Sequence, residues 1–288
     1  MATVTTSVSI QGDTVTAVSP EGTTREIKVK ELMEKMSPAD ACAKEIVMPD
    51  GGRKLLARGR MLILVHETPP RIFNFKWITK NSAATHGEEA DYRDVLIALP
   101  YVIVMAVFQC DANGNLKLGK TNECFFSKTP LESLDQKLCF PGLLNCSKYH
   151  NPEGNPLSWI CTQYLERRKM RLPSGPRLAP SQQLRNGLKN LLHCLFETGF
   201  NYSSEFNEGS SWYTESARVD KRIATVEAWE KATKKNKLFV LDVPWLETKL
   251  TAREITSRIF RNHGLADDQV LTTADDFARI VFNRRKPR

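Results

Sequence analysis

Two cysteines, Cys146 and Cys161, lie in a part of the chain whose residue types suit nucleophilic chemistry. Both fall within the Pro-, Gly- and Asn-rich segment 130–180, which has little apolar periodicity and is expected to form a long loop. Long loops in compact domains are often functional. The basic cluster 166–171 (ERRKMR) follows Cys161 closely, and nearby positive charge raises the thiolate fraction of a cysteine. Composition alone makes Cys161 a candidate nucleophile, beside the alternative of a small buried side chain.

The sequence lacks the motifs of several common enzyme classes. It has no Gly-x-Gly-x-x-Gly or Walker phosphate loop, no Gly-x-Ser-x-Gly turn, no His-Glu-x-x-His helix and no Cys-x-x-Cys pair. We therefore expect neither a cofactor nor a metal. His193 and Cys194 are adjacent in a predicted helix, so their side chains point about 100° apart and are expected to be structural. The other cysteines lie in or beside apolar runs, where a thiol behaves as a small apolar group: Cys42, Cys110, Cys124 and Cys139.

The first half of the chain predicts an antiparallel sheet. Alternating segments at 3–10 and 14–19 flank a turn at Gly12, and a short helix is expected over 29–36, ending near Ser37 and Pro38. Apolar runs rich in β-branched and aromatic residues then predict strands within 54–67, 71–78, 94–109, 115–120 and 123–127, with a hairpin loop at 110–115 and an exposed loop at 79–92. Short turns between successive strands favour antiparallel pairing.

Helices are expected in the last third. Apolar residues recur at helical spacing over 180–196, with Ser181 as the expected N-cap, and a second helix is predicted over 225–236. Residues 237–245 predict a short strand or extended run. A capping box from Thr251 to Glu254 opens a helix that stops near Gly264, and a last helix is expected over 273–282. The order of sheet, irregular loop and helices predicts an α+β fold.

The order of short motifs around the loop resembles a known family. Thr129-Pro130-Leu131 is followed by Pro141 and Asn145, then by Ile160-Cys161, and finally by the segment 196–203. In this order and spacing the chain resembles the bacterial ubiquitin-conjugating-enzyme-like proteins of prokaryotic family D, the family of the PRTRC system B proteins. The resemblance covers about residues 45–210.

The resemblance implies a fold and an activity. The fold is a ubiquitin-conjugating-enzyme-like core over 45–210, an antiparallel β-meander with flanking helices. A hairpin and helix over 1–44 precede it, and a helical extension over 211–288 follows it. The implied activity is that of a transferase. Cys161 accepts an acyl group as a thioester from an activating enzyme, and the acyl group then passes to an amine.

The resemblance also implies a polar donor for the oxyanion, which is often the largest single catalytic contribution. Asn145 is the aligned candidate, with Asn151 and Asn155 as local alternatives and turn formation as the structural interpretation of all three. The chain departs from the family pattern at Phe140-Pro141-Gly142, where eukaryotic ubiquitin-conjugating enzymes have His-Pro-Asn. An alternative alignment makes Cys146 the nucleophile.

The net charge of +8 favours an acidic partner. The resemblance implies a ubiquitin-like protein and an activating enzyme as partners, with a JAB-type metalloprotease as a further one from the same operon. Two alternatives stay open: a non-catalytic adaptor of the same fold, and a basic nucleic-acid-associated protein of a mobile-element or defence operon. The chain has no apolar run of about 20 residues and no secretory signal, so we expect a cytoplasmic bacterial protein without a membrane contact.

Overall fold

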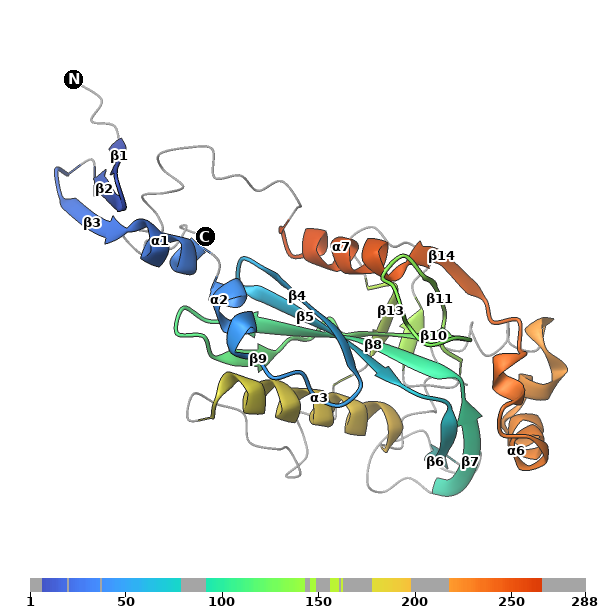
Figure 1. Ribbon diagram of the computed structural model, residues 1–288. Coiled ribbons are helices and arrows are strands. Elements are labelled where there is room, and N and C mark those ends of the chain that lie inside the picture. The colour runs from blue at the N-terminus through green and yellow to red at the C-terminus, as the bar shows by residue number, and fades with distance from the viewer. Residues whose placement is uncertain are drawn as a thin grey trace.

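The computed structural model has the expected α+β class (Figure 1). A nine-stranded sheet forms its centre, and helices lie on both sides of that sheet. No helix among the described residues is long and apolar enough to cross a membrane. The structure describes residues 7–19, 21–36, 38–78, 92–142, 146–148, 156–160, 162, 178–197 and 218–265.

The central sheet has the strand order β12-β13-β10-β8-β5-β4, and every pair in it is antiparallel. Its middle is apolar: every residue of β5 is buried, and so are most of β8 and all of β10. The sequence predicted strands in these apolar runs, but the run 94–109 is divided at Pro100 into two strands. The segment 130–180, expected to form a loop, contains short strands at 137–139, 146–148 and 158–160 that exist through pairing with neighbouring strands. The strands of the path are β4 (Gly52–Arg58), β5 (Met61–Thr68), β8 (Tyr101–Cys110), β10 (Glu123–Ser127), β13 (Ser158–Ile160) and β12 (Cys146–Lys148).

Three short strands extend this sheet. β9 (Leu116–Leu118) pairs with β8 across the turn at 111–115, which confirms the predicted hairpin loop. β11 (Lys137–Cys139) pairs with β10 on one side and with β14 (Glu247–Thr251) on the other. Strand β14 was not predicted, because its residues (ETKLT) contain a single large apolar side chain. It brings the C-terminal part of the chain into the central sheet.

Strands β6 (Arg71–Ile78) and β7 (Tyr92–Leu99) form a separate antiparallel pair among the described residues, rather than further strands of one continuous meander. Helix α6 (Val226–Lys235) covers β7. The Trp229 Nε1–H donates to the Ala98 carbonyl oxygen at 2.8 Å, and the Ala98 N–H donates to Thr233 Oγ1 at 3.0 Å. These two side chains bond the backbone N–H and carbonyl groups of Ala98 at the outer edge of β7. They thereby join the C-terminal part of the chain to this strand.

Helix α3 (Pro180–Phe196) packs beside the sheet with its predicted apolar face inward; Leu184, Leu188, Leu191 and Leu195 are all buried. The expected N-cap at Ser181 is wrong, since the helix begins at Pro180 and its cap is Ala179, two residues before Ser181. Proline is favoured at the first helical position because its missing N–H has no helical partner there. Ser181 instead accepts from the Val47 N–H at 3.0 Å and thereby ties α3 to the chain just after helix α2 (Pro38–Glu45).

The N-terminal strands form a small sheet of their own. The predicted hairpin is confirmed as β1 (Ser7–Gln11) and β2 (Thr14–Val18), with Gly12 at a positive φ of 58°. β3 (Thr24–Lys28) and α1 (Val29–Met36) complete the unit, which has a separate apolar cluster and projects away from the main body (Figure 1). Helix α2 (Pro38–Glu45) was not predicted, because Pro38 was interpreted as a helix stop. It packs on the main core through Ala39 and Cys42.

The C-terminal elements are mostly as expected. Thr225 caps α6, and α7 (Ala252–Asn262) opens with the predicted capping box of Thr251 and Glu254. The prediction of an extended run over 237–245 is wrong in part: Phe239–Leu241 form a 3-10 helix, η2, and a second one, η1, spans Lys221–Ile223. The helix expected over 273–282 and nearly all of the loop expected over 79–92 lie outside the described residues.

The contact of Gly187 with Phe108 yields a stability prediction. A Cβ at Gly187 would lie 2.6 Å from Cε1 of the fully buried Phe108 ring. Alanine favours a helix over glycine by about 1 kcal/mol, but overpacking a core costs about 1–3 kcal/mol. We expect Gly187→Ala to lower the free energy of unfolding in urea by about 1 kcal/mol. In the background of Phe108→Leu, which removes the ring, the same change should stabilise. A stabilising effect in the wild-type background would contradict this packing.

The buried His66 yields a pH prediction. It lies in β5 beside Gly51, and burial lowers its pKa from 6.5 to about 4. Between these values the unfolded chain takes up a proton that the folded chain excludes, so stability falls as the pH drops from 6.5 to 4, by up to about 3 kcal/mol. Urea unfolding of the wild type and of His66→Gln at pH 7, 5.5 and 4.5 measures this effect. The stability advantage of the wild type, as a difference in the free energy of unfolding, should shrink as the pH falls. If that difference stays constant with pH, protonation of His66 does not contribute to the pH dependence of stability.

Candidate functional site

The two residues named as catalytic by the resemblance, Cys161 and Asn145, lie outside the described residues, as do Asn151 and Asn155. The structure does describe the strands that flank them in sequence. β12 begins at Cys146, directly after Asn145, and β13 ends at Ile160, directly before Cys161. These two strands pair with each other, with Cys146 opposite Ile160. The site is therefore built here from β12, β13 and the elements that hold them.

Strand β13 is fixed to β10 by backbone and side-chain contacts. The Ile160 N–H donates to the carbonyl oxygen of Asn122 at 2.9 Å. The Asn122 side chain is itself held, since its Oδ1 accepts from the Val107 N–H at 2.9 Å and its amide donates to Gly119 at 2.8 Å. The Trp159 Nε1–H donates to the Lys120 carbonyl oxygen at 2.8 Å. This hydrogen bond ties the Trp159 ring to the segment just before β10.

A buried carboxylate completes this anchor. Glu123, at the start of β10, is 1% exposed and accepts from the backbone N–H groups of Leu157 and Ser158 at 3.0 and 3.3 Å. The guanidinium of Arg258, 6% exposed, donates to both carboxylate oxygens, with 2.7 Å to Oε1. Burial raises the pKa of Glu123, and Arg258 and the two N–H groups oppose that effect. Because every partner is a donor, the arrangement suits the ionised carboxylate.

Arg258 comes from α7, so the anchor connects three distant parts of the chain. Glu123 and Arg258 are separated by 135 positions, and α7 also follows β14 of the central sheet. An isolated charge in this place would be very costly, and the hydrogen-bonded pair removes most of that cost. We call Glu123, Arg258 and the Leu157–Ser158 backbone the Glu123 anchor. It fixes the strand that leads directly into Cys161.

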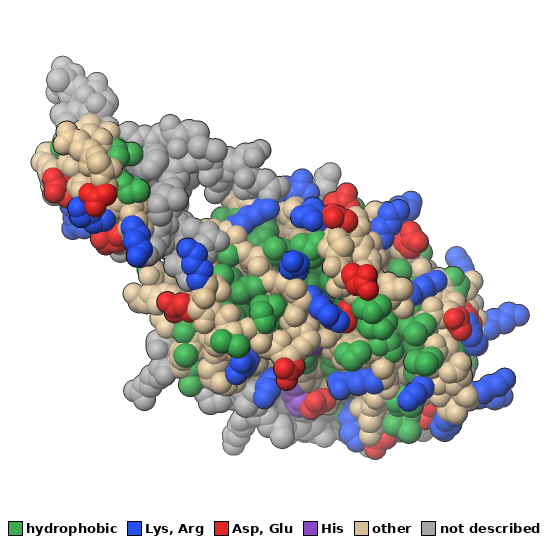
Figure 2. Space-filling model, in the orientation of Figure 1, with side chains coloured by type: hydrophobic (Ala, Val, Ile, Leu, Met, Phe, Trp, Pro, Cys, Tyr) green, Lys and Arg blue, Asp and Glu red, His purple; other side chains and the backbone are tan. Residues whose placement is uncertain are grey.

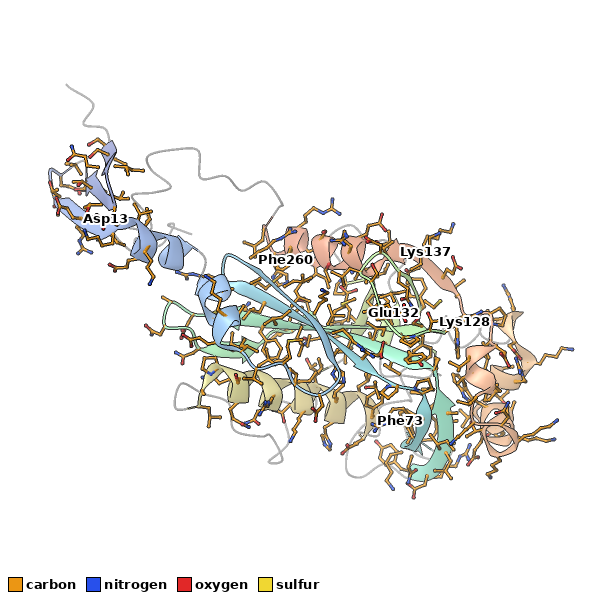
Figure 3. The ribbon with its side chains drawn as sticks, viewed as in Figure 1. Asp13, Phe73, Lys128, Glu132, Lys137 and Phe260 are labelled. Carbon is orange, nitrogen blue, oxygen red and sulfur yellow. The ribbon has the colours of Figure 1, made fainter. Side chains whose placement is uncertain are left out.

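A second buried carboxylate holds the turn that contains Thr129-Pro130-Leu131. Glu67 in β5 accepts from the Leu131 N–H at 2.6 Å and pairs with Arg53 of β4. Within the turn, the Gln136 amide donates to Ser127 Oγ at 2.7 Å and to Thr129 Oγ1 at 3.0 Å. This turn also carries Lys128 and Glu132, labelled in Figure 3. The sequence identified the turn by its motif but missed the glutamate that fixes it.

The described thiols are poorly suited to nucleophilic chemistry. Cys146, the alternative nucleophile, is half-buried in β12; its removal from water and its hydrogen bond with Cys124 raise its pKa well above the usual range. Cys139 lines a cleft of about 400 Å³ with Lys128 and Lys137, yet burial and then Glu247 raise its pKa to about 11. Both are thiols, not thiolates, at neutral pH.

The remaining described cysteines match the prediction of small buried groups. Cys42, Cys110, Cys124 and Cys194 are at most 4% exposed. Cys110 lowers the pKa of Cys42 through a side-chain hydrogen bond, but the Cys42 thiol is not accessible from solvent. His193 pairs with Glu197 at 2.6 Å, not with Cys194, as expected for neighbours on a helix. In the described ranges, no three His, Cys, Asp or Glu side chains are grouped so as to hold a metal ion.

Comparison with known proteins adds no relative: no protein-family profile, no curated protein and no solved structure matches this chain.

The Glu123 anchor can be tested by its energetics. Glu123→Gln leaves the Arg258 charge buried without its partner, so we expect a loss of about 3–5 kcal/mol in the free energy of unfolding. The double change Glu123→Gln and Arg258→Met removes both charges and should recover much of this loss. Urea unfolding provides the measurement.

The matched control for this test is the exposed pair of Arg253 and Asp135, which also joins α7 to the body of the protein. Asp135→Asn should cost much less than Glu123→Gln, because solvent screens an exposed pair. Equal losses for Glu123→Gln and Asp135→Asn would show that burial does not set the strength of the anchor.

Proposed function

We propose that this protein is a ubiquitin-conjugating-enzyme-like transferase in which Cys161 carries an acyl group as a thioester. The motif order described above supports the family assignment. The observation that carries the proposal is the Glu123 anchor, which fixes β13 directly before Cys161. A rigid strand before a nucleophile is what acyl transfer requires, because a displacement of about 1 Å can lower a rate by about 100-fold.

The proposed reaction has two steps. The Cys161 thiolate attacks the carbonyl carbon of a ubiquitin-like protein held as a thioester on an activating enzyme; a new C–S bond forms and the enzyme's thiolate leaves. A substrate amine then attacks the same carbon, the bond to Cys161 breaks, and the amine loses a proton. Both steps pass through an oxyanion, for which Asn145 is the proposed donor. The raised pKa of Cys146 supports Cys161 over it as the nucleophile.

Surface charge supports a negatively charged partner. The net charge is +8, and helix α6 carries exposed lysines at 231, 234 and 235. Figure 2 shows Lys and Arg side chains across the visible face and at the end where α6 lies. Complementary charge mainly raises the rate of association, so these lysines are proposed to attract an acidic surface of the activating enzyme or the modifier. Basic segments 166–171 and 284–288 lie outside the described residues.

The decisive test is thioester formation. The protein is mixed with ATP, a ubiquitin-like protein and an activating enzyme encoded beside it, and the products are separated on a non-reducing gel. We expect an adduct that thiols remove, that is absent from Cys161→Ala, and that forms normally in Cys146→Ala. Asn145→Ala should slow both the formation of the adduct and its transfer to an amine, each by about 10²–10³-fold, which is the usual cost of one oxyanion donor.

The other outcomes identify the alternatives. An adduct that survives Cys161→Ala but is lost in Cys146→Ala would transfer the role to Cys146. Binding of the modifier without any adduct would favour a non-catalytic adaptor. Salt-dependent retention on DNA, with no binding of the modifier, would favour a nucleic-acid-associated protein.

A further inference from the structure

A second cleft lies between strand β6 and the end of α3, and none of its lining residues belongs to β10, β13 or α7. Its volume is about 610 Å³, within the range of about 300–1,000 Å³ that small-molecule sites occupy. One wall is formed by Arg71–Asn74 and the other by the last turns of α3, from Lys189 to Glu197.

Stacked aromatic rings form the base of this cleft. Phe73, labelled in Figure 3, and Phe196 are nearly parallel, with centroids 4.3 Å apart and an interplanar angle of 21°. The Arg71 guanidinium lies over the Phe73 ring, 4.5 Å from its centroid. A guanidinium in such a stack keeps its N–H groups available at its edge. The cation is thus held in place without using its hydrogen-bond donors.

Among the described residues, two cations of the cleft have no carboxylate partner. Arg71 and Lys189 form no salt bridge with any residue that the structure describes. The single carboxylate in the lining, Glu197, is already bonded to His193 Nδ1 at 2.6 Å. Arg71 and Lys189 therefore present positive charge that no described carboxylate pairs with.

Charges of both signs line the cleft. Glu197 and the C-terminal end of the α3 dipole are both negative, so hydrogen-bond donors of a ligand are favoured next to them. Arg71 and Lys189 are positive and favour an anionic group. The apolar side chains of Ile72, 43% exposed, and Leu192 lie among these groups and offer contact to an apolar or planar part of a ligand.

We propose that this cleft binds a small organic molecule that has a phosphate or carboxylate group, bound by Arg71 and Lys189, and hydroxyl or amino donors directed at Glu197. This goes beyond the proposed transferase function, because an acyl carrier on Cys161 requires no small-molecule ligand. The site is independent of the Glu123 anchor, so either proposal can fail alone.

Isothermal titration calorimetry at constant ionic strength tests the site with three probes: AMP, citrate and uncharged adenosine. We expect at least one of the two anions to bind with a Kd of about 1 mM or tighter, and adenosine not to bind. AMP alone would identify phosphate as the preferred group, and citrate alone would identify carboxylate. Arg71→Gln and Lys189→Gln should each weaken binding about 10-fold or more, the usual effect of losing one charged hydrogen bond.

The matched control is Lys235→Gln, which removes the same charge from an exposed position on α6 and should leave the Kd unchanged. A thermal melt without probe confirms that each variant is folded. The proposal is overturned if neither anion binds, if adenosine binds as tightly as AMP, or if Lys235→Gln weakens binding as much as Arg71→Gln does.

Discussion

A buried carboxylate that must be neutralised is the constraint on which the rest of this structure depends. Glu123 begins a strand whose every residue is buried, and its charge is stabilised only because Arg258 and two backbone N–H groups surround it. Satisfying that one group brings β10, β13 and α7 to a common point. An apolar side chain in its place would need none of these elements, whereas the carboxylate specifies which three segments meet. Glu67 is a second buried carboxylate that fixes a segment distant in sequence, since it accepts from the Leu131 N–H.

Exclusion of water also determines which cysteines can be reactive. Within the sheet, desolvation raises the pKa of Cys139 and Cys146 and keeps them protonated. A thiol buried in the sheet is therefore a poor nucleophile, because burial keeps it protonated. A position at the end of a strand is better suited to a nucleophile, and the proposed nucleophile Cys161 comes directly after β13. The cleft beside α3 is the opposite case, since Arg71 and Lys189 lie at the surface and pair with no described carboxylate.

Local patterns predicted the elements well. The bounds of β6, β10 and α1 coincide with the predicted ones, because apolar runs there are interrupted by prolines, turns or charged residues. Two of the missed strands share a cause, since β14 and β3 have few apolar residues and exist because a neighbouring strand pairs with them. Pro38 was interpreted as a stop, although proline also suits a first helical turn. The local sequence does not show whether such a proline ends one helix or begins the next.

The candidate site was predictable only in part. The cysteines and the Thr129-Pro130-Leu131 turn could be found from residue types and motif order. A carboxylate at the head of the apolar run ECFFS was a signal that something polar must meet it, but its partner could not be identified. Arg258 lies 135 positions away in a helix that was predicted without any link to Glu123, and the two residues meet only in the folded chain.

That separation has a consequence for biosynthesis. A ribosome adds about 5–20 residues per second, so Glu123 emerges roughly ten seconds before Arg258 is made. Until then the apolar strand β10 carries a charge with no cation to meet it, and β13 lacks its final anchor. The sheet around the proposed nucleophile therefore closes late, after α7 has been synthesised, and during that interval the nascent protein exposes apolar strands that chaperones recognise.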